Sequence, residues 1–361
     1  MRFAFFGSSL VSAYWNGAAT YYRGLLKALA ARGHEVLFCE PDAFGRQAHR
    51  DIDDPDWARV FVFSGDCAGM EQALDQARDA DVVVKFSGVG VLDAELEQAV
   101  LANRHPHQTV LFWDVDAPAT LDRVHADVED PLRPLIPCFD AIFTYGGSDV
   151  VVRAYDKAGA RLCVPIYNAL DPDTHHPVPA EPRFKADLAF LGNRLPDREA
   201  RVDEFFLGAA AQLPQHRFLI GGNGWHDKPM PLNVVDAGHV YTRDHNAFNC
   251  TPRAVLNVNR ESMARYGASP PTRIFEAAGA GACIISDAWD GIDNFLEPGR
   301  EILVAHNGAE VAAYVQALDE STARQIGEAA RMRVLAGHTY ALRAAEVESV
   351  LEGRSQLREA V

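Results

Sequence analysis

The stretch that decides the fold is residues 2–40, RFAFFGSSLVSAYWNGAATYYRGLLKALAARGHEVLFCE. An apolar run, Arg2–Phe6, ends in Gly7-Ser8-Ser9. Tyr21–Arg32 follows with the apolar spacing of an amphipathic helix, closed by Gly33. A second apolar run, His34–Glu40, comes directly after it. This order of strand, small-residue turn, helix and strand is a βαβ unit, which implies a parallel sheet.

The same alternation continues through the first half of the chain. Helices are expected over Glu71–Arg78, Leu92–Ala102 and Val150–Ala158. Further apolar runs predict buried strands over Asp81–Phe86, Thr109–Trp113, Ala141–Tyr145 and Ala160–Ile166. Continuous apolar strands separated by helices indicate a doubly wound α/β domain.

A proline-rich polar stretch, 171–183, interrupts the pattern and is typical of a linker. Beyond it the alternation resumes, with a helix over Arg198–Ala211 and strands over Ala186–Leu191, Arg217–Ile220, Ala254–Asn257, Ala282–Ser286 and Ile302–Ala305. We therefore predict two Rossmann-like domains, 1–170 and 184–335, facing across a cleft, with a further segment at 336–361.

Composition narrows the class of protein. The 361 residues carry 34 Lys and Arg against 50 Asp and Glu, a net charge of −16, which disfavours binding to nucleic acid or anionic membranes. The six cysteines form no C-x-x-C pair, so neither a zinc site nor a redox motif is indicated. No apolar stretch approaches the ~20 residues that span a bilayer, and the N-terminus has no signal-peptide pattern. A cytoplasmic location is expected.

Ligands of open parallel sheets bind beyond the carboxyl ends of the strands, so the strand-end turns are the candidate site. Gly7-Ser8-Ser9 lacks the G-x-G-x-x-G fingerprint of NAD sites, and is either a tight turn or a loop that presents backbone N–H groups to a ligand. Gly192-Asn193-Arg194 follows a strand and opens a helix. With Arg198 nearby, it suits a diphosphate.

The stretch 257–287 is the most informative. Pro270 and Pro271 precede a short helix rich in Ala and Gly, which carries Glu276. A carboxylate beside a strand-end cleft is suited to accept the two vicinal hydroxyls of a ribose. The alternative is a partner for Arg273 or for the helix dipole.

The run Pro271–Asp287 resembles the nucleotide-sugar signature of GT-B glycosyltransferases of group 1 type, and Pro298–Leu303 continues it. Asn168-Ala169-Leu170-Asp171-x-x-x-His175-x-Pro177 resembles the N-G-V-D-x-x-x-F-x-P linker of the same group. His338-Thr339-Tyr340-x-x-Arg343 resembles the H-T-Y-x-x-R of the branch related to the spore-maturation protein CgeB.

This resemblance implies an enzyme that moves a sugar from a nucleotide-diphosphate-sugar donor, a UDP-sugar foremost and a GDP- or TDP-sugar otherwise, to a hydroxyl acceptor. It implies no cofactor and no metal ion. The C-terminal domain would hold the donor, and the segment 336–361 would cross back to the N-terminal, acceptor-side domain. The residues predicted to bind the donor, from this resemblance and from the strand-end positions together, are Glu276, Gly192, Asn193, Arg194, Arg198, Arg260, Ser269, Thr272, Arg273, Gly7, Ser8 and Ser9.

The chain departs from the family where retaining members carry a sugar-contacting Glu, because Ala268 stands there. Arg260 or Tyr266 could fill the space, and the stereochemical outcome stays open. Asp114 and Asp116 at a strand end are candidates for a general base, although Asp116 could instead cap the next helix. The candidates on the acceptor side are Tyr14, Trp15 and Asn16, and His175-His176 are interpreted as linker histidines.

Three other functions were weighed against transfer. A sugar-nucleotide epimerase of GT-B fold would need acids and histidines around the anomeric carbon, and no such set is evident. A two-domain protein that closes on a nucleotide or sugar without chemistry remains an alternative. A nicotinamide-dependent dehydrogenase is disfavoured by the missing glycine fingerprint. The acceptor, whether a small molecule, a glycan or a protein, is left open, as is the oligomeric state.

Overall fold

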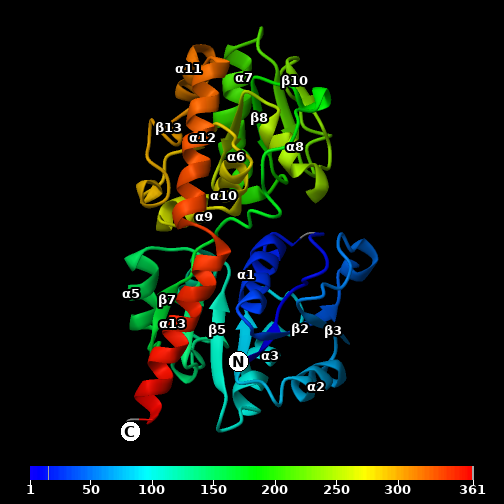
Figure 1. Cartoon of the computed structure of the whole chain (residues 1–361), viewed down its shortest axis with the longest axis vertical. Coiled ribbons are helices and arrows are strands. Elements are labelled where there is room, and N and C mark those ends of the chain that lie inside the picture. Colours follow the sequence, from blue (N-terminus) through cyan, green and yellow to red (C-terminus); the bar gives the residue numbers. More distant parts are fainter. Residues whose placement is uncertain (15, 360–361) are drawn as a thin grey trace. The chain divides into compact units, whose positions relative to one another are not determined.

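A computed structural model of the chain describes residues 1–14 and 16–359. It divides into two compact units (Figure 1). The first comprises Met1–Asn168 together with the chain from Tyr340 onward, and the second is Ala169–Thr339. Among the described residues, no helix is both long enough and apolar enough to cross a membrane.

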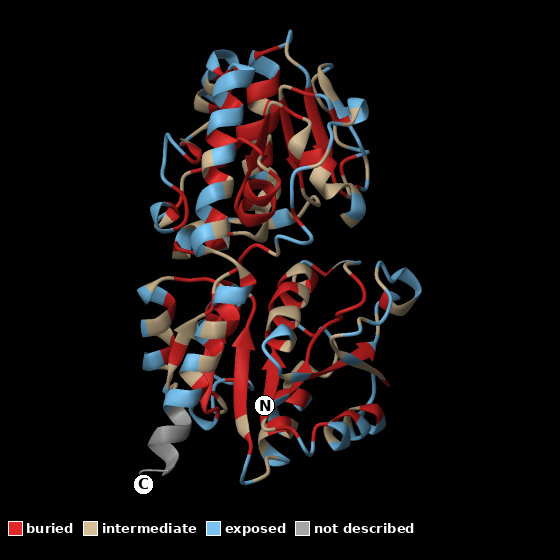
Figure 2. Ribbon diagram, in the orientation of Figure 1, coloured by how far each residue is buried: buried red, intermediate tan, exposed pale blue. Residues whose placement is uncertain are grey.

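The first unit is built on a parallel sheet in the order β3-β2-β1-β4-β5-β6-β7. Its middle strand β4 is buried throughout, as expected for a sheet covered on both faces. The neighbouring strand β5 is buried beyond its first residue (Figure 2). The register pairs Ala4 with Leu37 on one side and with Val83 on the other. The strands are β1 (Arg2–Phe6), β2 (Glu35–Asp42), β3 (Arg59–Ser64), β4 (Val82–Phe86), β5 (Thr109–Asp114), β6 (Ala141–Thr144) and β7 (Cys163–Pro165).

Helices on either side of this sheet are stabilised at their starts by side-chain caps. Asp66 accepts a hydrogen bond from the Gly69 N–H at 2.8 Å, and Ser148 caps the helix that begins at Asp149. The helices are α1 (Ala19–Ala31), α2 (Cys67–Gln76), α3 (Asp93–Ala102), α4 (Ala117–Ala126), α5 (Asp149–Lys157) and α13 (Tyr340–Glu359), with 3₁₀ turns at Arg46–His49 and Ile136–Cys138.

The last helix, α13, packs on α1 within this first unit. Gly24 allows that close contact, because a Cβ there would lie 2.2 Å from the ring of Tyr340. Farther along, Glu348 accepts hydrogen bonds from Arg32 and from His34, the latter at 2.7 Å. The C-terminal helix is therefore part of the first unit although its sequence follows the second.

The second unit contains a parallel sheet in the order β10-β9-β8-β11-β12-β13. Its apolar core cluster packs one face of the sheet, through alternate strand residues such as Phe190 and Phe218, against residues of the covering helical segments such as Phe206. The strands are β8 (Leu188–Leu191), β9 (Phe218–Gly221), β10 (Val234–Asp236), β11 (Ala254–Asn257), β12 (Ile284–Asp287) and β13 (Leu303–Ala305). The helices are α6 (Pro196–Val202), α7 (Gly208–Gln212), α8 (His245–Cys250), α9 (Glu261–Tyr266), α10 (Thr272–Gly279), α11 (Gly308–Ala317) and α12 (Glu320–Gly337), with 3₁₀ turns at Pro182–Phe184, Thr242–Asp244 and Ile292–Asn294.

The predicted fold class, two doubly wound α/β sheets, is confirmed, but several element boundaries were wrong. The expected helix over Arg198–Ala211 is interrupted by a π-helical turn at Asp203–Leu207. The expected strand over Ala160–Ile166 shortens to Cys163–Pro165. The helix expected over Glu71–Arg78 begins at Cys67, because Asp66 caps it there. The short edge strands β3 and β10 were missed.

Candidate functional site

The candidate site of the second unit lies at the carboxyl edge of its sheet. The strand order changes direction between β8 and β11, and ligands of such sheets bind at that switch point. The loops that start there are Gly192–Arg194 after β8 and Val258–Arg260 after β11. Gly222, with φ of 120°, brings the next loop against the first, because a Cβ there would lie 2.3 Å from the Gly192 carbonyl oxygen.

Asn193 and Arg194 both take part in bonds within the protein. The Asn193 Oδ1 accepts from the Asn223 N–H at 2.9 Å, and the Gly192 carbonyl accepts from the Trp225 indole at 2.7 Å. Arg194 forms ion pairs with Glu199 at 2.7 Å and Asp227 at 3.0 Å. Asn193 therefore shapes the loop, and the charge of Arg194 is already neutralised by two carboxylates.

Three other arginines lie near one another at this edge. Burial, followed by the positive charge of Arg273 and then of Arg260, lowers the pKa of Arg198 to about 10, against the pull of Asp197. Burial also lowers the pKa of Arg273. Arg260 is paired with Asp197 at 2.5 Å, but in the part of the chain that the structure describes no ion pair joins Arg198 or Arg273 to a carboxylate.

The environment of Arg198 leaves a donor available. Its Nη2 donates to the Asn193 carbonyl, and its Nε is buried without a hydrogen-bond partner. Arg198 also explains why residue 192 is a glycine, because a Cβ at Gly192 would lie 2.9 Å from the Arg198 Nη2. Partly buried cations that repel one another, one of them with an unused donor, form a site for an anion.

Helix α10 adds its amino end to this site. Its N-cap residue Pro271 makes no side-chain cap, and its first turn holds no acidic residue. The backbone N–H groups of that turn therefore lack intrahelical partners. Thr272 is the first helical residue, whereas the buried Ser269 donates its hydroxyl to the Gly267 carbonyl at 3.1 Å. The predicted residue Ser269 thus shapes the turn before the helix.

The turn that leads into α10 has an unusual backbone. Gly267 and Ala268 have φ of 66° and 36°, and the Ala268 N–H donates to the Asp290 carbonyl at 2.6 Å. Positive φ at a buried alanine is strained and is sustained by its surroundings. Tyr266, one of the two residues considered for the space of the missing Glu, ends α9.

Glu276 lies about one helical turn beyond Thr272 and is only 5% exposed. The His175 Nε2 lies 3.7 Å from its Oε1. His245, on α8, is a further neighbour, and its pKa is lowered to about 4 by burial first, with Glu276 acting in the opposite direction. His175 was predicted to be a linker histidine, and His245 was not predicted. The one available signal was the histidine that stands where the related motif has phenylalanine.

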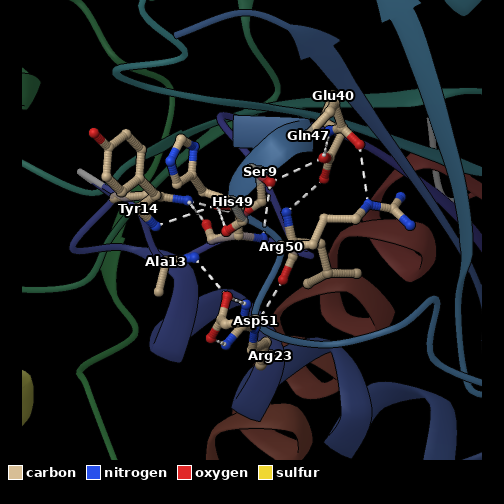
Figure 3. A network of polar contacts seen from close by, with 12 residues as sticks. Ser9, Ala13, Tyr14, Arg23, Glu40, Gln47, His49, Arg50 and Asp51 are labelled. Carbon is tan, nitrogen blue, oxygen red and sulfur yellow. Dashed lines mark hydrogen bonds and ion pairs between the residues drawn. The ribbon is translucent and has the colours of Figure 1, made fainter. Parts of the chain in front are cut away.

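At the carboxyl edge of the first unit, the switch point lies between β1 and β4, beside Gly7-Ser8-Ser9. Glu40 organises this loop (Figure 3): it accepts the Ser9 hydroxyl at 2.8 Å and the Leu10 N–H at 2.6 Å. The Ser8 hydroxyl donates to the Asn16 Oδ1 at 3.0 Å. The polar side chains of this loop are therefore hydrogen-bonded within the protein. Glu40 was not predicted from the sequence pattern.

The predicted acceptor-side residues follow the loop. Asn16 donates its Nδ2 to the carbonyls of Ser9 and Ser12, and Tyr14 stacks on His49 with ring centroids 4.1 Å apart (Figure 3). Trp15 lies outside the described residues. Arg46, which sequence analysis did not consider, is buried and donates to the carbonyls of Ser8 and Val89, each at 3.2 Å, thereby joining the two loops of the switch point.

Asp114 and Asp116 have different environments at the end of β5. Asp114 is fully buried and accepts from the hydroxyls of Ser87, Thr120 and Tyr155 at 2.7, 3.0 and 2.5 Å. It also accepts the Asp116 N–H at 3.0 Å, and burial raises its pKa. Asp116 is partly exposed and occupies the N-cap position of α4, but its side chain makes no cap bond, so its alternative role as a helix cap was wrong.

Residues 198–349 match a protein family described as glycosyl transferase-like. No curated protein sequence matches the chain. Sucrose-phosphate synthase from Thermosynechococcus elongatus is similar in structure, with a TM-score of 0.70 and 14% identity over all of both chains.

Two further solved structures share the fold. HepE of Anabaena, in complex with UDP and glucose, has a TM-score of 0.67 and 13% identity, covering 98% of this chain and all of that one. The T4 phage protein BGT, in complex with its UDP-glucose substrate, has a TM-score of 0.62 and 13% identity over 98% and 99% of the two chains.

The family match and the fold confirm the resemblance that the sequence motifs indicated. Residues 198–349 match a glycosyl transferase-like family, and the chain as a whole has the two-domain GT-B fold. Its placement in the branch related to CgeB stays a prediction.

Proposed function

We propose that the protein transfers a sugar from a nucleoside-diphosphate-sugar donor to a hydroxyl acceptor without a metal ion. One observation carries the proposal. In the second unit, an arginine cluster and the uncapped start of α10 lie beside the buried carboxylate of Glu276. A cationic patch beside a carboxylate is the combination that suits a diphosphate joined to a ribose.

The diphosphate would be held by Arg198, Arg260 and Arg273 together with the first N–H groups of α10. Cleavage of the sugar–phosphate bond leaves a nucleoside diphosphate with increased negative charge. Fixed positive groups stabilise that charge more in the transition state than in the substrate. Binding an anion also removes the mutual repulsion that lowers the pKa of Arg198. These groups do the work that a divalent ion does in other transferases, which supports metal independence.

Glu276 would accept the two ribose hydroxyls. A buried carboxylate has strong acceptor oxygens and a high desolvation cost, so it favours a ligand that brings two donors. The base is taken to be uracil first, with guanine and thymine as alternatives. The complexes of HepE with UDP and of the T4 phage protein with UDP-glucose support this order.

For the acceptor hydroxyl, Asp116 is the better of the two candidate bases. Four donors already occupy the carboxylate of Asp114, so accepting another proton there would break several hydrogen bonds. Asp116 is less buried and lies at the carboxyl end of β5. Gly7, Ser8 and Ser9 would contribute a preformed loop to donor binding, and Tyr14 and Asn16 stay candidates for the acceptor side.

The first test is a thermal-shift panel of UDP, GDP, TDP, CMP and NAD on the wild type, Glu276→Ala and Glu276→Gln. A ligand that binds only the folded state raises the unfolding midpoint. We expect one nucleoside diphosphate to stabilise the wild type, and both variants to lose most of that shift. Nucleotide release from the matching nucleotide sugar, measured with and without EDTA, then tests transfer chemistry and metal independence.

Other outcomes would redirect the assignment. Stabilisation by NAD alone, or by no nucleotide, contradicts a nucleotide-sugar donor. A nucleotide that binds while its sugar is neither released nor transferred favours a non-catalytic binding protein. Conversion of the bound nucleotide sugar to its epimer favours the epimerase. Loss of nucleotide release in EDTA contradicts metal independence alone.

A further inference from the structure

The segment Leu170–His175 crosses helix α10 at very short range. Gly279 makes this crossing possible: a Cβ there would lie 2.3 Å from the Leu170 Cδ1 and 2.9 Å from the His175 carbonyl oxygen. The His175 N–H donates to the Asp171 carbonyl at 2.9 Å, and the Thr174 carbonyl accepts from Asn246 of α8 at 2.9 Å. His175 is therefore held in place by its backbone against both α8 and α10.

The imidazole of His175 is buried but makes no hydrogen bond within the described residues. It is 3% exposed, and neither Nδ1 nor Nε2 has a hydrogen-bond partner. Each buried polar atom without a partner costs about 1–3 kcal/mol, so such groups need an explanation. A phenylalanine, which the related linker motif has at this place, would fill the space without that cost.

A carboxylate oxygen of Glu276 lies 3.7 Å from the Nε2 of this ring. That distance is too long for a hydrogen bond, but a movement of less than about 1 Å would bring it into range. Two other side chains lie near the Glu276 carboxylate. Arg273 is about one helical turn before Glu276 on α10, and His245 approaches from α8, with its pKa lowered to about 4 by burial. Because His245 is uncharged near neutral pH, it does not act as a positively charged partner of the Glu276 carboxylate.

We infer that His175 is a positioning residue for Glu276 and makes the site selective for ribose over deoxyribose; the inference rests on the proposed function. With a ribonucleotide bound, the Nε2–H donates to Glu276 and keeps its oxygens directed at the 2′- and 3′-hydroxyls. A site whose buried polar groups are satisfied by a substrate hydroxyl discriminates strongly against a ligand that lacks it. His175 acts through Glu276 and does not itself touch the nucleotide.

The test compares Kd values for UDP and 2′-deoxy-UDP, measured by calorimetry, in the wild type, His175→Phe, His175→Gln and the control His176→Phe. His176 is the exposed neighbour, with its ring beside the Pro177 carbonyl. We expect His175→Phe to weaken UDP about 10-fold and 2′-deoxy-UDP less than about 2-fold. His175→Gln, which keeps a donor, should stay within about 3-fold of the wild type for UDP, and His176→Phe should change neither ligand.

Stability separates this role from packing. His175→Phe removes two unsatisfied polar atoms, so its unfolding midpoint without ligand should equal or exceed that of the wild type. The inference is overturned if His175→Phe binds UDP as the wild type does, if it loses both nucleotides equally, or if His175→Gln loses as much as His175→Phe. If the wild type binds no nucleoside diphosphate, the proposed function fails and this inference fails with it.

Discussion

At the carboxyl edge of the first sheet, Asp114 accepts four hydrogen bonds and Glu40 ties down the loop after β1. At the same edge of the second sheet, two arginine charges lack an ion-pair partner within the described part of the chain. Arg198 and Arg273 have no carboxylate partner among the residues described, and Arg198 is repelled by its neighbours.

The two edges have the same topological position but different electrostatics. In the first, polar side chains satisfy one another and stabilise a fixed loop structure. In the second, the cost of partly buried, repelling cations is offset when an anion binds. Substitutions at the first edge should therefore cost stability, and substitutions at the second should cost affinity for the nucleotide.

The largest effect is expected for Asp114→Ala. It leaves the buried hydroxyls of Ser87, Thr120 and Tyr155 without their acceptor, which should lower the free energy of unfolding by about 4 kcal/mol. Urea unfolding measures it. Asp114→Asn keeps one acceptor oxygen and should cost about half as much. If instead Asp114→Asn keeps full stability and nucleotide affinity but abolishes transfer, Asp114 is the catalytic base and the comparison fails at the first edge.

Arg198→Met should have the next largest effect, on binding. Loss of charge-assisted bonds to the diphosphate is expected to raise the Kd for the matching nucleoside diphosphate about 100-fold, equivalent to about 2.7 kcal/mol. The unfolding midpoint of the free protein should not fall, because the removed cation is repelled by Arg273 and Arg260. Calorimetry and thermal unfolding of one preparation measure both. A less stable variant with unchanged affinity would make Arg198 a structural residue like Asp114.

Much of the fold could be predicted from the sequence because its signals are local. The run Val82–Phe86 is apolar enough to predict a strand buried on both faces, and small residues after Phe275 predict a helix packed tightly on a sheet. The edge strand β3 was missed, although Arg59–Ser64 is largely apolar, because one side of it is only partly covered. The π-helical turn at Asp203–Leu207 has no comparable sequence signal.

The site residues also differ in whether local sequence indicates them. Glu276 and Arg198 could be named because a motif and a strand-end position pointed to them. The contacts that determine their chemistry could not, since they join segments far apart in the chain. His175 reaches Glu276 across a hundred residues, and the donors to Asp114 come from three different segments. Such contacts depend on tertiary structure, which short-range spacing does not encode.

His245, which lies near Glu276 in the second unit, allows a test by pH. Its folded-state pKa of about 4 lies below the ordinary 6.5, so as pH falls the unfolded chain binds the proton first. The stability contributed by the neutral ring is thus complete above about pH 6.5 and is lost toward pH 4. Between pH 7.5 and pH 5 the loss should be about 2 kcal/mol.

This loss is measured as a difference between variants in urea unfolding at the two pH values. His245→Asn should be less stable than the wild type at pH 7.5, and that gap should shrink by about 2 kcal/mol at pH 5. His239→Asn, at an exposed histidine of the preceding loop, is the matched control and should show no change in its gap. An equal shrinkage for both variants would mean that burial does not set the protonation of His245.

The smallest effect is expected for Arg194→Met, the control for Arg198→Met in the same loop region. Arg194 already pairs with Glu199 and Asp227, and Glu199 also accepts from Lys228 at 2.6 Å. Partly exposed pairs contribute little, and Lys228 continues to neutralise Glu199 in the variant. The Kd for the nucleoside diphosphate should therefore change less than about 3-fold. A loss as large as that of Arg198→Met would show that Arg194 leaves its carboxylates to bind the diphosphate, and that the cationic site extends across the whole loop after β8.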